Sequence, residues 1–392
     1  MKRKILLFTI YLLFTSTCCI EAAMPTTNDY LNYAKAVADG EMNYKSLESS
    51  VYKTTWNYKL AFLNNAYLNL YEATQVDSYY DYVETIADNF LDEQGLIMTY
   101  TSESFDLRNI CGGKFLYDIY YHNRGGSRYL NSMILLRKQL HKQPRTEERA
   151  FWFSQAHTNQ LWLDGLYMAM PFYCLYAAIL DEPQIFNDVA IQFTIAERRT
   201  LDKATGLNYQ AWDEMKTCAW ANKATGTTTA FFGQSIGFYM MALVDMLDYF
   251  PVNHSYRGEI IKTLNRVASA LTKYQDKSGM WYQVVNMPKD KANFLESSST
   301  AMYAYAFAKG VNNGYLPKKY RKFAEKAFSG LVNNCIDYDE NAQTAIVTRG
   351  TSDADLDAGD GTVDFYLNLP LKNREPNATV AFIMAAVELA KY

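Results

Sequence analysis

The sequence is poor in the residue patterns that usually mark metal sites. It holds six cysteines and four histidines, and it has no CxxC pair and no cysteine–histidine spacing typical of zinc ligands. Four cysteines lie beyond the first two dozen residues: Cys111, Cys174, Cys218 and Cys335. A chain of this length buries an adequate core without disulfides. We therefore predict free, buried thiols, no metal site and no organic cofactor.

Long apolar runs are also missing. The N-terminal run from Ile5 to Phe14 has about ten apolar residues, whereas a helix that spans a bilayer needs about 20. Positive residues precede this run, and small residues follow it as far as Ala23, which is the pattern of an export signal. Residues 1–23 are predicted to be a signal peptide, with a lipid anchor at Cys18 or Cys19 as the alternative to simple cleavage. The expected location is the periplasm or surface of a bacterium, and no transmembrane span is expected.

The charges are nearly balanced, and no segment gathers positive charge. The 38 Lys and Arg residues and 42 Asp and Glu residues give a net charge of −4, without a basic patch or a Lys/Arg-rich helix. Nucleic acid is therefore excluded as a partner. No linker rich in Pro, Gly or Ser divides the chain, and no repeat of fixed period occurs. Residues 24–392 are predicted to form a single domain.

Helical periodicity dominates what is present. In Tyr58 to Tyr71, apolar residues recur with the i, i+3, i+4 spacing of an amphipathic helix. About twelve such helices are expected in total. They cover 28–39, 58–71, 78–92, 114–122, 127–141, 160–181, 184–198, 233–249, 256–274, 297–312, 317–336 and 377–391. An inner and an outer ring of six would bury every apolar stripe and leave a ligand cavity at one end. Periodicity alone does not choose that arrangement.

Three groups of segments carry a more specific pattern. The first is Gln160 to Phe172 (QLWLDGLYMAMPF), and the second joins Ala211–Glu214 to Phe232–Pro251. The third joins Gly279–Gln283 to Leu295–Ser299 and Lys309–Leu316. These segments resemble the unsaturated glucuronyl and rhamnogalacturonyl hydrolases, glycoside hydrolase families 88 and 105. The resemblance extends over nearly the whole chain and implies an all-α, single-domain (α/α)6 barrel.

The resemblance also implies a reaction and its catalytic residue. In this family an Asp protonates C4 of the C4=C5 double bond that lyases leave on a terminal uronic acid, and water then adds at C5. The hydrated sugar opens and releases its neighbour in the oligosaccharide. The first segment places that residue at Asp164. Such a carboxyl has to hold its proton near neutral pH, and Trp162, Leu163, Leu166 and Met168 provide apolar neighbours that raise a pKa.

Several residues depart from the usual family pattern. Phe153 stands where the family usually has a His after Phe-Trp, and Gln210 replaces a His before Ala-Trp-Asp. Phe232, Gln234 and Phe238 replace Trp, Arg and Trp. Arg108 stands where a second acid is usual, with Asp106 close by. The substrate-binding residues expected on this basis are Trp56, Tyr58, Asp106, Arg108, Phe153, Trp162, Gln210, Trp212, Asp213, Phe232, Gln234 and Phe238.

Without the usual Arg and His, the carboxylate of a uronic acid substrate lacks the cations that are expected to bind it. Gln cannot replace Arg, because it has no charge and cannot donate the two parallel hydrogen bonds of a guanidinium. We expect Arg108 to bind the substrate carboxylate and Asp106 or Asp213 to support Asp164; Arg349 is a weaker candidate cation. Two alternatives stay open. One is a catalytically inactive, carbohydrate-binding relative. The other is a helical-barrel hydrolase of saturated sugars, which needs a second carboxylate such as Asp106, Asp213 or Glu296 opposite Asp164.

Overall fold

The computed structural model describes residues 26–44, 54–122 and 126–391. The predicted signal peptide, with Cys18 and Cys19, lies outside the described residues. Among the described helices, none is long and apolar enough to cross a membrane. Cys111, Cys174, Cys218 and Cys335 are all free thiols, and all but Cys218 are buried, so the prediction of free cysteines is confirmed and that of burial holds for three of the four.

Twelve of the described helices have nine or more residues, close to the ranges that periodicity predicts. They are α1 (Thr27–Met42), α3 (Tyr58–Thr74), α4 (Asp77–Phe90), α5 (Gly113–Tyr121), α6 (Ser127–Lys142), α7 (Leu163–Ile179), α8 (Gln184–Thr200), α9 (Gly233–Leu247), α10 (Arg257–Thr272), α11 (Ser297–Asn312), α12 (Arg321–Cys335) and α14 (Pro376–Ala390). The short α13 (Val363–Leu367) follows a long loop.

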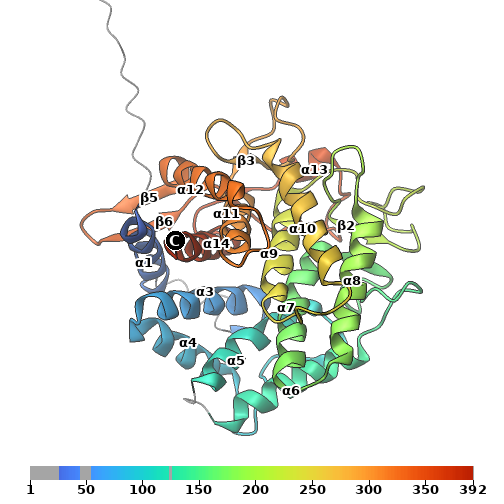
Figure 1. Cartoon of the computed structure of the whole chain (residues 1–392), viewed down its shortest axis with the longest axis horizontal. Helices are drawn as coiled ribbons and strands as arrows, with labels where there is room; N and C mark the ends of the chain where they lie inside the picture. The colour runs from blue at the N-terminus through green and yellow to red at the C-terminus, as the bar shows by residue number, and fades with distance from the viewer. Residues whose placement is uncertain (1–25, 45–53, 123–125, 392) are drawn as a thin grey trace, which may run out of the picture.

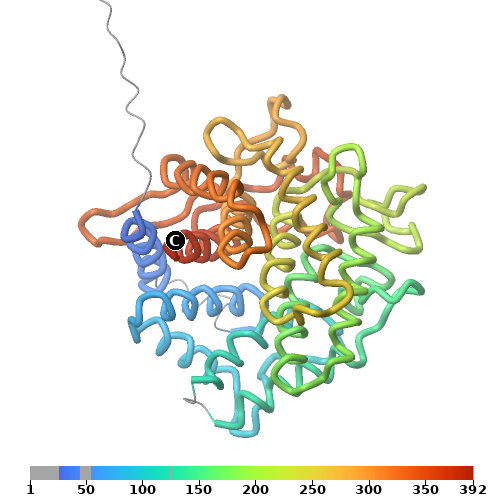
Figure 2. The backbone as a smooth tube through the Cα atoms, viewed as in Figure 1, coloured from blue at the N-terminus to red at the C-terminus, as the bar shows by residue number. Residues whose placement is uncertain are grey.

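The helices form two concentric rings, as the resemblance implies. Helices α3, α5, α7, α9, α11 and α14 contact one another in sequence, and α14 returns to α3 and closes the inner ring. Helices α1, α4, α6, α8, α10 and α12 pack outside it. In Figure 1, α1 and α14 lie side by side, and the tube of Figure 2 shows the red end of the chain returning to the blue N-terminal helices. The (α/α)6 barrel is therefore confirmed.

Four of the inner helices, α7, α9, α11 and α14, are buried on nearly every face, which agrees with their place in the middle. Every residue of α9 is buried, and in α7, α11 and α14 only residues at the ends or facing the cavity reach solvent. A helix with apolar residues all round is stable only when other elements surround it. The outer helices instead carry one buried stripe. Helix α4, for example, buries Tyr79, Tyr80, Val83, Ile86 and Phe90 and exposes its opposite face.

Two predicted helix starts are wrong by a few residues. Gln160–Trp162 is strand β1 rather than the first turn of a helix, because it pairs antiparallel with β2 (Ala211–Asp213). Trp162 keeps an extended backbone, and α7 begins at Leu163. Helix α12 begins at Arg321, after a separate 3-10 turn at Lys318–Tyr320.

Six further short strands form hairpins at the ends of the helices, and their two to four residues are too few for a periodicity to predict. They are β3 (Trp281–Tyr282) with β4 (Leu295–Glu296), β5 (Ile336–Asp339) with β6 (Thr344–Val347), and β7 (Gly350–Thr351) with β8 (Leu371–Lys372). The β7 strand leads into the loop of residues 352–362, which returns over one end of the barrel.

The close contact of neighbouring inner helices gives a test of the ring. A Cβ atom on Gly237 of α9 would lie 2.6 Å from Sδ and 2.8 Å from Cβ of Met302 of α11. We expect Gly237→Ala to lower the free energy of unfolding by about 1–3 kcal/mol through overpacking. Gly258→Ala on the outer helix α10 is the matched control, because no atom lies within 4 Å of its added methyl group. Urea denaturation measures both, and equal stability of the two variants would contradict the close contact.

Candidate active site

A cavity of about 250 Å³ lies at the end of the barrel where the inner helices begin. The first two turns of α3, α7 and α9 provide Tyr58, Asp164 and Phe238. Met168 of α7 also faces the cavity. The remaining wall comes from a 3-10 turn, strand β1 and two loops, and it consists of Arg108, Phe153, Ala156, His157, Trp162, Asp353, Ala354, Asp355 and Asp357. Because this is the N-terminal end of the inner helices, their dipoles make it the electropositive end of the barrel.

The strand pair β1–β2 sets the position of Asp164. Pairing of Trp162 with Ala211 holds the chain extended up to the helix, and the Leu163 amide donates to the Gln210 carbonyl at 2.9 Å. Helix α7 then starts at once, so that Asp164 is its second residue and its side chain faces the cavity.

The surroundings of Asp164 raise its pKa to about 7. Burial is the largest cause, and the nearby Asp353 carboxylate adds to it, whereas the Ser235 hydroxyl and the Arg108 charge oppose the rise. Oδ1 of Asp164 is buried and makes no hydrogen bond to a described group. The helix N-terminus would itself favour the anion, but loss of hydration outweighs it here. A large share of the Asp164 side chains is therefore protonated near neutral pH and able to donate a proton.

Asp353 is the second acid close to Asp164, and it is held on several sides. Its Oδ1 accepts hydrogen bonds from the Tyr58 hydroxyl at 2.5 Å and from Nδ2 of Asn377 at 2.8 Å. Its Oδ2 lies 3.0 Å from Nζ of Lys59. These contacts join the loop after β7 to the starts of α3 and α14. The loop is thereby fixed as one wall of the cavity.

Arg108 faces the cavity but is already paired. Its Nε and Nη2 atoms donate to both oxygens of the Asp106 carboxylate, at 2.7–3.0 Å. Its guanidinium also lies 5.3 Å from the centre of the Phe153 ring. The charge of Arg108 is thus largely matched by Asp106 before any ligand binds.

An aromatic stack forms the wall beside Arg108. The Phe153 and Trp162 rings are stacked, with their centres 4.5 Å apart. The His157 ring stands edge-on to both, at 5.3 Å and 4.7 Å. Flat apolar faces beside carboxyl groups suit a sugar ring, which has apolar C–H faces and a polar rim.

Comparison with known proteins identifies the family. The sequence profile of Glycosyl Hydrolase Family 88 matches residues 31–392, which is nearly all of the chain. The chain belongs to glycosyl hydrolase family 88. This family 88 hydrolase is 26% identical over 305 residues to the unsaturated rhamnogalacturonyl hydrolase YesR of Bacillus subtilis, covering 76% of this chain and 80% of that protein.

Two solved structures support the same fold. A family 105 glycoside hydrolase of C. acetobutylicum superposes with a TM-score of 0.87 at 33% identity, covering 92% of this chain and all of that one. The unsaturated glucuronyl hydrolase of Bacillus sp. GL1 superposes with a TM-score of 0.69 at 10% identity, covering 93% and 97% of the two chains. At so low an identity the second similarity shows the fold alone.

The structure brings half of the predicted site residues together in the cavity of the family 88 hydrolase. Those that line it are Tyr58, Arg108, Phe153, Trp162, Asp164 and Phe238. Two more lie one layer behind. Asp106 holds Arg108, and Gln210 accepts from the Tyr366 hydroxyl at 2.7 Å and donates to the Ala354 carbonyl. Gln210 therefore positions the loop that carries the acids.

The other predicted residues do not line the cavity, and each has a structural partner. Asp213 accepts hydrogen bonds from the backbone amides of Met215, Thr217 and Cys218 and so organises its own loop. Trp56 donates to the Asn109 carbonyl, Phe232 stacks on Tyr366, and Gln234 donates to the Thr351 carbonyl. Trp212 lies beneath the Arg199 guanidinium.

The remaining candidates also lie elsewhere. Arg349 donates to the Leu295 carbonyl. Glu296 caps α11, where its carboxylate accepts from the amides of Ser298 and Ser299. Neither residue lines the cavity.

Sequence reasoning missed the residues that loops supply. His157 and three acids of one loop, Asp353, Asp355 and Asp357, line the cavity. The alternation of Asp with small residues after Ser352, in a segment without helical periodicity, is a signal for a polar functional loop. Nothing in the sequence indicates that this loop lies opposite Asp164, almost 200 residues earlier in the chain.

The raised pKa of Asp164 has a consequence for stability. Burial favours the protonated form, so the penalty for ionising this group is absent below the ordinary pKa of 3.8, grows between that pH and about 7, and is constant above it. Asp164→Asn, which mimics the protonated group, is expected to raise the melting temperature at pH 8 and to raise it clearly less at pH 5. The gain in the free energy of unfolding at pH 8 is at most about 4 kcal/mol, which is the full value of a pKa shift of this size. Calorimetry at both pH values measures it, and an equal effect at pH 5 and pH 8 would contradict the raised pKa.

Proposed function

We propose that this glycoside hydrolase removes the unsaturated uronic acid from the non-reducing end of oligosaccharides cut by polysaccharide lyases. The observation that carries the proposal is the buried carboxyl of Asp164, whose pKa is raised to about 7 at the floor of a sugar-sized cavity. The unsaturated rhamnogalacturonyl hydrolase YesR, similar along most of the chain, supports this substrate class.

The chemistry needs a proton donor and water. Protonated Asp164 gives its proton to C4 of the C4=C5 double bond, and positive charge develops at C5, where the ring oxygen shares it. A water molecule adds to C5 and returns a proton to the Asp164 carboxylate, which is thereby restored. The product is a hemiketal at C5; its ring opens, and the neighbouring sugar leaves from the anomeric carbon. A group that acts in turn as acid and base works best when its pKa lies near the working pH.

The geometry of the cavity also distinguishes this reaction from the two alternatives, an inactive carbohydrate-binding relative and a hydrolase of saturated sugars. A protonated acid held in a cavity has little use in a protein that only binds sugar, which favours catalysis over an inactive relative. Hydrolysis of saturated sugars would need a second acid facing Asp164. Asp353, and none of Asp106, Asp213 and Glu296, is the acid that lines the cavity close to it. Its hydrogen bonds to Tyr58 and Asn377 and its ion pair with Lys59 suit a fixed wall rather than a nucleophile.

The location of the enzyme is part of the same proposal. The N-terminal pattern of positive, apolar and small residues is typical of export, and Cys18 or Cys19 offers a site for a lipid anchor. An exported enzyme in the periplasm or at the cell surface would meet the products of extracellular lyases.

A bleaching assay tests the reaction. The C4=C5 bond conjugated to a carboxylate absorbs ultraviolet light, and hydration removes that absorbance. The wild-type enzyme is expected to bleach unsaturated uronyl disaccharides, and Asp164→Asn to slow this by about a hundredfold or more, the usual contribution of a general acid. Glu340→Gln, an exposed acid in the β5–β6 turn, is the control and should match wild type. Release of saturated sugars without bleaching would replace this proposal by a two-carboxylate hydrolase.

The role of Arg108 is tested separately. If its guanidinium helps to hold the substrate, Arg108→Ala raises KM by about tenfold or more, the value of one charged hydrogen bond. The same change also frees Asp106, so the double variant Asp106→Asn/Arg108→Ala removes both charges of the pair. A return of the double variant to wild-type KM would show that Arg108 only neutralises Asp106.

A further inference from the structure

We propose that His157, Asp355 and Asp357 bind one divalent transition-metal ion at the mouth of the cavity, and that this ion holds the carboxylate of the substrate. The ion site does not depend on the proposed function, while its role toward the substrate rests on that function. The resemblance to families 88 and 105 implies no such ion.

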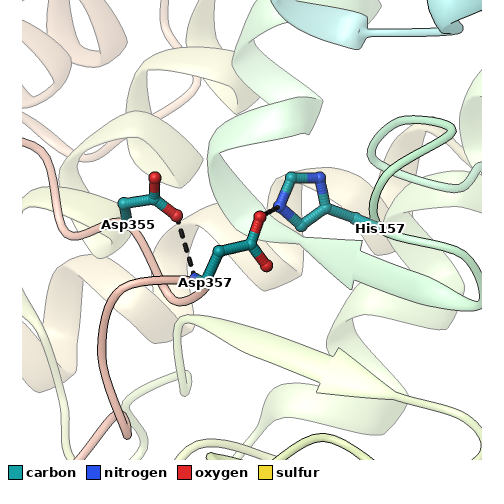
Figure 3. Close-up of side chains that lie close together, drawn as sticks. All are labelled: His157, Asp355 and Asp357. Carbon is teal, nitrogen blue, oxygen red and sulfur yellow. Dashed lines mark hydrogen bonds and ion pairs between the residues drawn. The ribbon is translucent and has the colours of Figure 1, made fainter.

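The three side chains meet from two distant segments of the chain. His157 comes from the loop between α6 and β1, and both acids come from the loop after β7 (Figure 3). One nitrogen of His157 and one carboxylate oxygen from each Asp all lie within 4.8 Å of one another. Metal–ligand bonds of about 2.0–2.6 Å place the ligand atoms of one ion about 3 to 5 Å apart, so a single ion fits between them.

The His157 ring is buried and held in one orientation. Its side chain is 5% exposed, and its Nδ1 lies 2.6 Å from Oγ of Ser154, while the Phe153 and Trp162 rings make T-shaped contacts with it. Histidines that bind metals usually have the second ring nitrogen hydrogen-bonded in this way, which fixes the ring and leaves the first nitrogen with its lone pair. With its proton on Nδ1, His157 presents the lone pair of Nε2 to the acids.

The contact between His157 and Asp357 is close but misdirected. Nε2 of His157 lies 2.8 Å from Oδ2 of Asp357, yet this buried nitrogen makes no hydrogen bond to a described group. The oxygen therefore lies to one side of the direction in which the ring nitrogen would donate. An ion bonded along that direction would touch Nε2 and Oδ2 together without lying on the line between them. The misdirected contact thus leaves room for an ion that both atoms reach.

The charge of the cavity gives an independent reason for a cation. Four acids line it, Asp164, Asp353, Asp355 and Asp357, and Arg108 is the only Lys or Arg among the described lining residues. Asp106 already matches Arg108, and Lys59 pairs with Asp353. Even with Asp164 protonated, Asp355 and Asp357 would repel a uronate. A divalent ion neutralises both and adds an open coordination position that a carboxylate can fill.

The ligand types favour a transition-metal ion. One imidazole nitrogen with two carboxylate oxygens suits Mn²⁺, Zn²⁺ or Co²⁺, because Ca²⁺ and Mg²⁺ prefer oxygen alone. Asp357 is 56% exposed, so solvent or substrate can reach the remaining coordination positions. The Asp355 carboxylate also accepts from the Asp357 amide at 2.9 Å, which keeps the two acids on the same side of the loop.

Binding of Mn²⁺ to the full chain, freed of metal by a chelator, tests the site directly. Electron paramagnetic resonance measures free Mn²⁺, and we expect one bound ion per chain. His157→Ala and Asp357→Asn should each weaken binding by about tenfold or more, since even the neighbours of metal ligands are worth about 10- to 100-fold. Zn²⁺ should displace Mn²⁺ more readily than Ca²⁺ or Mg²⁺ does.

Two control variants match the ligands. Asp360→Asn removes an exposed acid of the same loop outside the cluster, and His122→Ala removes a histidine outside the cavity, which pairs with Glu72 at 2.7 Å. Both should bind Mn²⁺ as wild type does. Because Asp357 is exposed, Asp357→Asn stays informative if His157→Ala fails to fold. Absence of binding by wild type, unchanged binding by Asp357→Asn, or a preference for Ca²⁺ or Mg²⁺ would overturn the ion site.

Kinetics with an unsaturated disaccharide separates the ion site from the reaction. Removal of the metal should raise KM by about tenfold, with a smaller change in kcat, and Mn²⁺ should restore it. An unchanged KM in a chain that binds Mn²⁺ would overturn the role of the ion in holding substrate. If Mn²⁺ binds as expected but no unsaturated substrate is bleached, the proposed reaction fails and the ion site stands.

Discussion

The chemistry of this protein depends on a carboxyl group that is kept out of water at the start of an inner helix. Asp164 lies in the first turn of α7, where the helix dipole favours ionisation, yet burial raises its pKa to about 7. The two effects oppose each other, and burial wins because the walls around the group are packed. Its neighbours, Leu163 and Gly165, are buried, and the Phe153 ring closes over Gly165.

The double ring of helices makes that burial possible. Four of the six inner helices, α7, α9, α11 and α14, are buried on nearly all faces, and six outer helices pack around the inner ring. Helices α3, α7 and α9 begin at the same end, so that Tyr58 of α3 and Phe238 of α9 lie beside Asp164. Helix α14 belongs to the same end, since its Asn377 holds Asp353. The architecture thus gathers residues from three inner helices and one distant loop around a single cavity.

The loops decide the charge of the cavity. The resemblance to families 88 and 105 implies cationic or ionisable residues at the positions where this chain has Phe153, Gln210 and Gln234. Gln210 and Gln234 now hydrogen-bond the backbone of the acidic loop and of the strand before it, at Ala354 and Thr351. The two glutamines therefore support the segment that brings three acids to the cavity mouth. The aromatic stack of Phe153 and Trp162, with His157 edge-on to both rings, faces the same loop.

The sequence alone determined the helices, the catalytic candidate and the family, because helical periodicity and the Gln160–Phe172 segment are local patterns. The sequence also predicted apolar surroundings for Asp164, because four residues near Asp164 in the chain are apolar. Only the tertiary structure decided which other residues reach Asp164. Asp213 and Glu296 looked like partners, but backbone amides of their own segments bind them, and Asp353 from a distant loop stands there instead. Short strands such as β1, and loops such as 352–362, owe their position to pairing and packing with segments far along the chain. No local pattern in a sequence records those contacts.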